Sequence, residues 1–535
     1  MLTTTGDVTF QQMLGGNGVE SLDITTDGNL SLAGPVTDLA LLDLDALGVV
    51  TLGADLSGIT SLMISARGTT EIDTASISTG TADFGNAVTL LQDLSLTATG
   101  DVTFQQALSG SGLESLDITT DGSVSFDSSI MDLLLLDLDA LGTTSFLGNI
   151  SNVSSLITSA RGSTLIDTSS LSAGTILFGN PVSLLQDLVL NATGDVTFQQ
   201  TFMGTGFESV ELNVLGSVLF QGEVTALALL DVTATGGIEI DTSLLQSDRI
   251  LLQNEVVIDQ NLELIASQEL QFASSVMGAT GQESITIFST AGVVDFLGAV
   301  GSLQDVTIHG AADVLVNQTV QLTGDWNSLN GTGDFIVNGI LQAAGIVIQS
   351  NTLTINAEME AFQGGIEIHC TDEILVNDVV RSSGNGMILL DAANRIEFTA
   401  PGQVLGEGTG SIHLTADDGS VLATGQIVMA DGSFISAESQ VNLQAGGDIT
   451  VAHVASQSAA ADSIVVLTRN GGVIDGGDLQ RDFATPGGLQ IVSATGVGSA
   501  NPLETDIQVL NVSNGSGAIA ISNAGALQIS GVDQQ

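Results

Sequence analysis

Apolar and polar residues alternate in short bursts along most of this chain, and a glycine closes many of the bursts. The repeated unit reads apolar-x-apolar-x-small-x-Gly, as in LDITTDG at 22–28, LDLDALG at 42–48 and LMISARG at 62–68. Alternation of this kind is typical of a β-strand with one buried face, and glycine readily forms the sharp corner that follows. No stretch of useful length has the 3.6-residue period of an amphipathic helix. The pattern predicts an all-β protein made of short strands.

The unit recurs at nearly constant spacing. From Gly6 onward the closing glycines are 22, 20, 20 and 32 residues apart, which carries the pattern to Gly100. A period near 20 residues indicates a solenoid, so we predict a parallel β-helix of about 20–23 residues per turn, with turns about 4.8 Å apart. We expect residues 1–249 to form a β-solenoid with long super-repeats. We expect residues 250–535 to continue it with degenerate repeats.

A longer repeat of 94 residues contains the shorter one. Residues 6–99 align with 100–193 without a gap, and 57 of the 94 positions are identical. The phrase GDVTFQQ begins at residues 6, 100 and 194. In its first copy Val8 and Phe10 should face the core, while the residues between them face out. We therefore interpret the phrase as part of a repeated scaffold and not as a binding site.

The repeat also predicts which residues stack inside the solenoid. One interior column should contain Leu22, Leu42, Leu62 and Leu94. A second interior column should include Leu96. A third should include Ala66 and, in the next unit, Ala98. We expect the 32-residue step to add a lateral loop or strand around STGTADFGN at 78–86.

Composition narrows the possible partners. Of 535 residues, 61 are acidic and 7 are basic, all of them Arg, which gives a formal charge of −54. Such a charge repels nucleic acids and anionic membranes, and the apolar runs are too short to span a bilayer. We expect no nucleic-acid partner and no membrane insertion. The single cysteine, Cys370, leaves no internal disulfide framework and should be a buried apolar residue.

Several phrases resemble those of large repetitive bacterial exoproteins of the filamentous haemagglutinin type, many of them two-partner secretion adhesins. The phrases are LTATGDVTF at 96–104, ADDGSVLATGQI at 417–428, GGDITVAHV at 446–454 and the tail at 493–532. The resemblance implies a right-handed parallel β-helix and an extracellular or bacterial cell-surface location. It also implies an outer-membrane secretion partner and contacts with host or cell-surface glycans or proteins. The family's secretion domain is not matched here.

Paired acids are the candidate chemistry. Asp23 and Asp43 fall at the same slot in successive turns, as do Asp117 and Asp137. Two carboxylates about 5 Å apart repel each other, and a bridging Ca²⁺ could offset the repulsion. Solvated acids that splay apart are the alternative. We predict no catalytic and no cofactor-binding residues.

The leading hypothesis is a non-catalytic rod segment of a secreted or cell-surface adhesin-like exoprotein. A carbohydrate-active β-helix enzyme is one alternative, although the chain has no Lys, no Tyr and only scattered Arg for such chemistry. A Ca²⁺-dependent surface-layer or matrix component is the other alternative.

Overall fold

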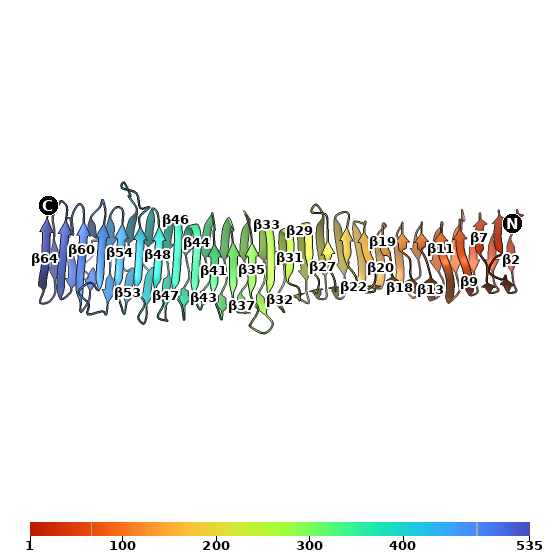
Figure 1. The fold of residues 1–535 in the computed structure, drawn as a ribbon, viewed down its shortest axis with the longest axis horizontal. Coiled ribbons are helices and arrows are strands. Elements are labelled where there is room, and N and C mark those ends of the chain that lie inside the picture. Colours follow the sequence, from red (N-terminus) through yellow and green to blue (C-terminus); the bar gives the residue numbers. More distant parts are fainter. Residues whose placement is uncertain (66, 291, 478–479, 535) are drawn as a thin grey trace. The chain divides into compact units, whose positions relative to one another are not determined.

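The computed structural model describes residues 1–65, 67–290, 292–477 and 480–534. Within these ranges the chain forms strands joined by turns and contains no helix, so no helix there could cross a membrane. The strand pairings are parallel, and the chain winds through about 26 turns of a β-solenoid (Figure 1). The predicted fold class, an all-β parallel solenoid, is confirmed, with two more turns than the 535 residues suggest at about 22 per turn.

The chain divides into two compact units, Met1–Val257 and Ile258–Gln535. The strands of the first unit are β1 (Leu2–Thr4), β2 (Val8–Phe10), β3 (Leu14–Gly15), β4 (Ser21–Thr26), β5 (Leu30–Leu32), β6 (Val36–Thr37), β7 (Leu41–Ala46), β8 (Val50–Leu52), β9 (Leu56–Ile64), β10 (Thr69–Ile72), β11 (Ser76–Phe84), β12 (Ala87–Leu90), β13 (Leu94–Ala98), β14 (Val102–Phe104), β15 (Leu108–Ser109), β16 (Ser115–Thr120), β17 (Val124–Phe126), β18 (Ile130–Ala140), β19 (Thr143–Phe146), β20 (Ile150–Thr158), β21 (Ser163–Ile166), β22 (Ser170–Phe178), β23 (Val182–Leu184), β24 (Leu188–Ala192), β25 (Val196–Phe198), β26 (Phe202–Met203), β27 (Ser209–Val214), β28 (Val218–Phe220), β29 (Val224–Ala234), β30 (Ile238–Ile240) and β31 (Leu244–Leu252).

In the sequence, β32 (Val256–Ile258) spans the boundary. The strands of the second unit are β33 (Leu262–Phe272), β34 (Val276–Gly278), β35 (Ile285–Phe288), β36 (Val293–Phe296), β37 (Val300–Leu303), β38 (Val306–His309), β39 (Asp313–Val316), β40 (Val320–Leu322), β41 (Trp326–Leu329), β42 (Asp334–Val337), β43 (Leu341–Ala343), β44 (Ile346–Ile355), β45 (Met359–Ala361), β46 (Ile366–Val376), β47 (Val379–Ser382), β48 (Ile388–Ala392), β49 (Arg395–Phe398), β50 (Gln403–Gly406), β51 (Ile412–Ala416), β52 (Gln426–Met429), β53 (Phe434–Ala437), β54 (Val441–Ala445), β55 (Ile449–Val451), β56 (Val454–Ser456), β57 (Ile464–Thr468), β58 (Val473–Asp475), β59 (Phe483–Ala484), β60 (Gly488–Ser493), β61 (Leu503–Asp506), β62 (Val509–Asn514), β63 (Ile521–Asn523) and β64 (Gln528–Gln534).

Each turn of the first unit lays three strand segments on three faces. β4 lies on the first face, β5 on the second and β6 on the third, and each pairs in register with the strand one turn later. Longer strands such as β11 pass a corner, so that their two halves pair on two different faces. Alternate side chains point inward, and those of Leu42, Leu44 and Ala46 have no exposed surface. The core is therefore a continuous stack of apolar residues in register.

The three copies of GDVTFQQ lie on three different faces. β2 carries the first copy and pairs with β5 on the second face. β14 carries the second copy on the first face, and β25 carries the third copy on the third face. A step of 94 residues covers four and two-thirds turns, so each copy is rotated by one third of a turn from the last. Phe10, which was predicted to face the core, is half-buried in the first turn, and its equivalents Phe104 and Phe198 are fully buried.

The predicted interior columns are correct for their first members and wrong for their last. Leu22, Leu42 and Leu62 lie in register on the first face, but Leu94 lies on the third face opposite Leu116. The predicted placements of Leu96 and Ala98 are wrong for the same reason, while Ala66 lies outside the described residues.

The 32-residue step from Gly68 to Gly100 causes this displacement. It contains β10, the two halves of β11, β12 and β13, which make one and two-thirds turns. The lateral feature predicted at 78–86 is wrong, because residues 78–84 continue β11 and pair with the turns on both sides, with one register shift between Ile77 and Thr79.

A glutamate closes a loop of the same shape in each 94-residue repeat. The carboxylates belong to Glu20, Glu114 and Glu208, and Glu283 closes a similar loop in the second unit. Glu283 accepts hydrogen bonds from the backbone N–H groups of Thr280 (3.1 Å), Gly281 (2.9 Å) and Gln282 (3.2 Å), and from the Thr280 hydroxyl. The Thr280 hydroxyl and the N–H groups of Glu283, Thr280 and Gly281 lower the pKa of Glu283 to about 2, although burial acts in the opposite direction.

A long loop at 417–425 leaves the second unit between β51 and β52, and it is visible as a protrusion in Figure 1. Val421 and Leu422 at its tip are each 84% exposed. Arg469, two turns later, holds the base of the loop through an ion pair of 2.7 Å with Asp417. Asn470 donates a hydrogen bond to the carbonyl of Ala423 at 2.9 Å. The loop is thus fastened to the solenoid on both sides of its apolar tip.

Candidate functional site

The structure brings together the two acidic pairs that the sequence singles out. Asp23 lies directly opposite Asp43 on the first face, and Asp117 lies opposite Asp137 on the third face. The four carboxylates therefore form two separate pairs. On the next turn Met63 follows Asp43 and Ile157 follows Asp137, so neither row of acids continues.

Burial and like charge raise the pKa of one acid in each pair. Burial raises the pKa of Asp43, and the negative charges of Asp23 and Asp45 add to the effect. Burial and the charges of its neighbours raise the pKa of Asp137 in the same way. One carboxylate oxygen of Asp43 is buried without a hydrogen-bond partner. These are the conditions in which a cation would be stabilising, so Ca²⁺ binding at the pairs stays a prediction.

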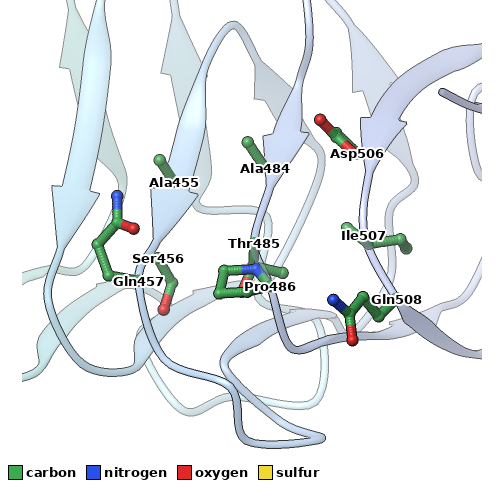
Figure 2. Close-up of a pocket in the computed structure, with 9 residues that line it drawn as sticks. All are labelled: Ala455, Ser456, Gln457, Ala484, Thr485, Pro486, Asp506, Ile507 and Gln508. Carbon is green, nitrogen blue, oxygen red and sulfur yellow. The ribbon is translucent and has the colours of Figure 1, made fainter. Parts of the chain in front are cut away.

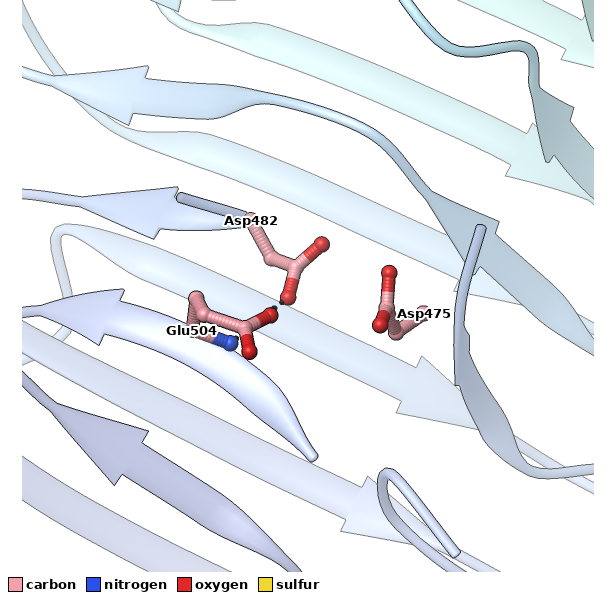
Figure 3. A group of neighbouring side chains, drawn as sticks. All are labelled: Asp475, Asp482 and Glu504. Atoms are coloured by element: carbon pink, nitrogen blue, oxygen red, sulfur yellow. Dashed lines mark hydrogen bonds between the residues drawn. The ribbon is translucent and has the colours of Figure 1, made fainter. Parts of the chain in front are cut away.

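A tighter acidic group lies near the end of the second unit. Among the described residues, Asp475, Asp482 and Glu504 bring one carboxylate oxygen each to within 4.8 Å of one another. Asp475 ends β58, Asp482 directly precedes β59, and Glu504 lies in β61 (Figure 3). Asp475 is 7% exposed and Asp482 is fully buried. Three carboxylates at this spacing are ligands of the kind that Ca²⁺ prefers.

Backbone and amide donors orient these carboxylates. The N–H of Glu504 donates to Asp482 at 2.8 Å (Figure 3), and the N–H of Gly477 donates to Asp475 at 2.9 Å. The Asn501 side-chain amide donates to the second oxygen of Asp475. One oxygen of Glu504 is buried without a hydrogen-bond partner. The repeat pattern does not predict this group, because Asp475 and Asp482 are only seven residues apart and belong to no period of the repeat.

An open depression lies on the surface beside this group. Its volume is about 330 Å³, and it extends over β56, β59 and β61 (Figure 2). Gln457, Thr485 and Gln508 line it together with Asp506, which forms an ion pair of 2.9 Å with Arg481. The Thr485 hydroxyl bonds within the protein, to the carbonyl of Ser458 at 3.1 Å. The depression therefore offers amide groups at its rim and one carboxylate already neutralised.

Cys370 and two arginines make contacts within the fold. Cys370 is 6% exposed, as predicted, and burial raises the pKa of its thiol to about 12. A thiol with such a pKa is almost entirely protonated and a poor nucleophile at neutral pH. Arg161 bonds Asp139 at 2.6 Å, and Arg67 lies 3.6 Å from Asp45. The two arginines occupy equivalent repeat positions, and each offsets the acidity of the turn before it.

Comparisons with protein-family models, with curated proteins and with solved structures find no match. The class of this protein therefore follows from its fold. Parallel strands, three faces per turn and a repeat that keeps the core define a β-solenoid repeat protein.

Proposed function

We propose that this chain is a non-catalytic structural segment of a secreted or cell-surface adhesin-like exoprotein of the filamentous haemagglutinin type. The observation that carries the proposal is the rotation of the 94-residue repeat. Identical phrases such as GDVTFQQ lie on three different faces, so their outward residues cannot line one common site. What the repeat retains is the buried residue, the corner and the length of the solenoid.

The corner residues of the phrase support a scaffold role. Asp7, Asp101 and Asp195 each accept a hydrogen bond of 2.8 Å from the backbone N–H of the residue that lies one turn later. Each aspartate thus joins two turns at a corner. The aspartate of the phrase thus makes a hydrogen bond that stabilises the fold, which favours a structural role for the phrase over a catalytic one.

The proposed cell-surface location follows from the resemblance to filamentous haemagglutinin-type exoproteins, and the net charge of the chain is consistent with it. A chain with a formal charge of −54 stays hydrated and repels anionic surfaces, which suits a long exposed segment that must not collapse on its own cell. In this role the solenoid carries other modules away from the cell, and weak contacts along its faces add up.

Surface labelling of the producing cells tests the proposal. An antibody raised against the purified chain should label intact cells, and protease added outside should remove the label while a cytoplasmic marker stays intact. Labelling that needs permeabilised cells, with full protection from external protease, would refute the surface role.

The acidic groups favour one second candidate, a Ca²⁺-dependent surface-layer or matrix component. Asp475, Asp482 and Glu504 supply the observation, because two of the three are almost completely buried. A melting temperature that is the same with Ca²⁺ and with EDTA would rule this candidate out.

A further inference from the structure

An uncharged groove runs along the second face of the first unit. It consists of two adjoining depressions of about 380 Å³ and about 320 Å³ that share Ser172 and Thr193. Its lining crosses β20, β22, β24, β27 and β29, so it passes over successive turns. We call this surface the uncharged groove; its polar lining residues include Asn152, Ser172, Asn191, Thr193, Asn213 and Thr233.

The polar groups of the groove repeat once per turn. Ser172 lies opposite Asn191, Asn191 opposite Asn213, and Asn213 opposite Thr233. Each turn therefore presents one hydroxyl or amide at a spacing of about 4.8 Å along the stack. A ligand that matched the groove would itself be extended and would carry a repeating series of hydrogen-bonding groups.

Most of these groups are available. The side chains of Ser172, Asn191, Thr193 and Thr233 make no hydrogen bond within the described part of the chain. Asn191 and Thr193 are exposed, while Ser172 and Thr233 are half-buried. Amides and hydroxyls both donate and accept, which is the capacity that sugar hydroxyl groups require.

The groove carries no ionisable side chain, although the chain contains 61 acidic residues. Two carboxylates border the lining: Glu211 accepts a hydrogen bond from Asn213 at 2.8 Å, and Asp132 accepts one from Asn152 at 2.9 Å. An anionic polymer would meet the negative field of the whole surface and would find no cation in the groove. A cationic ligand would find no carboxylate among the lining residues themselves. An uncharged ligand is therefore the complement.

The shape excludes a small compact ligand. The depressions are open to solvent and shallow, whereas a small molecule bound tightly is buried over most of its surface. A polymer that lies across several turns can instead combine many weak contacts. We propose that the uncharged groove binds an extended, uncharged polysaccharide aligned with the stacking direction of the turns. This inference stands on the groove alone and does not depend on where the protein is located.

Affinity electrophoresis of the full chain tests the inference. Native gels containing a soluble neutral glucan, mannan or galactan should retard the wild-type protein with at least one of the three polymers. Carboxymethylated glucan, an anionic polymer, should not. The test variant is Asn191→Val with Thr193→Val, which removes two adjacent polar groups and should weaken the retardation about ten-fold.

The repeat offers a matched control. Thr97 and Thr99 occupy the positions 94 residues before Asn191 and Thr193, are also exposed, and lie on the third face. The variant Thr97→Val with Thr99→Val should keep wild-type retardation, and both variants should melt at the wild-type temperature. The inference is overturned by the absence of retardation with all three neutral polymers, by an equal loss in both variants, or by stronger retardation in the anionic gel.

Discussion

Phe104 stacks face to face on Phe84, its neighbour one turn earlier, with ring centroids 4.8 Å apart and ring planes 8° apart. Phe126 continues the stack at 5.2 Å and Phe146 at 5.7 Å. All four rings are buried. The in-register ladder imposes parallel stacking at the spacing of the turns, so the four rings form a continuous column in the core of the first face.

Removal of one ring should leave a cavity between two turns. Because Phe104 is 1% exposed, Phe104→Ala should lower the free energy of unfolding by about 3–5 kcal/mol. Urea unfolding followed by circular dichroism measures the change. Phe207→Ala is the matched control, since Phe207 is 85% exposed, and it should change the free energy by less than about 0.5 kcal/mol. Equal effects of the two substitutions would contradict the stacked core.

The fold follows from the sequence because alternation and corner glycines are local signals. The placement of residues on faces does not, because the 94-residue repeat contains a number of strand segments that is not a multiple of three. Leu94 therefore left its expected column, although every one of its local features was interpreted correctly. A periodic sequence determines which side of a strand is buried. The face of the solenoid on which the strand lies depends on the number of corners that precede it in the chain.

One candidate site could be predicted from the repeat, and the other could not. Asp23 and Asp43 were placed opposite each other because they occupy the same slot of consecutive units, and the structure confirms that they are neighbours. Asp475 and Asp482 lie close together, but they are only seven residues apart and no repeat relates their two positions. Sequence periodicity is therefore uninformative for this group.

The Glu283 loop predicts a defined loss of stability in acid. The pKa of Glu283 is about 2 in the folded chain, below its ordinary value of 4.5, so ionisation of this group stabilises the fold. Its contribution should be complete above about pH 4.5 and should disappear as the pH falls toward 2. Glu283→Gln should cost about 1–2 kcal/mol at pH 7 and much less near pH 2, as measured by urea unfolding at several pH values.

Glu438→Gln provides the comparison for Glu283, because Glu438 is exposed and makes no side-chain hydrogen bond in the described part of the chain. It should leave the unfolding curve unchanged at pH 7. If Glu283→Gln cost the same at pH 2 as at pH 7, the carboxylate would not be the group that holds the loop.

Replacing an acid of the pairs should raise the melting temperature without calcium and should reduce the stabilisation that calcium gives. The pKa of Asp43 is raised in the folded chain, so its ionised form destabilises the fold, and this penalty develops as the pH rises from about 3.8 through the raised value. In EDTA at pH 7, Asp43→Asn should therefore raise the melting temperature. Added Ca²⁺ should raise the melting temperature of the wild type, and the double variant Asp43→Asn with Asp137→Asn should lose most of that response.

Asp27→Asn is the control for the calcium experiment, since Asp27 is an exposed acid near the same pair. It should keep the wild-type response to Ca²⁺. A wild-type melting temperature that is indifferent to Ca²⁺ would leave the solvated-acid alternative as the correct one for both pairs.

The ion pair between Arg469 and Asp417 predicts how the long loop is held. Asp417 has a side chain that is 2% exposed, so Arg469→Ala should leave a buried carboxylate without its cation. Only hydrogen bonds from the Gly419 N–H and the Gln444 amide would then offset its desolvation. The base of the loop should open, and limited proteolysis should cut within 417–425 at least about ten-fold faster than in the wild type. Arg67→Ala removes an ion pair whose arginine is 54% exposed and whose N–O distance is 3.6 Å, so it should leave proteolysis of the loop unchanged. Cleavage at the wild-type rate in Arg469→Ala would show that Asn470 and the backbone suffice to fasten the loop.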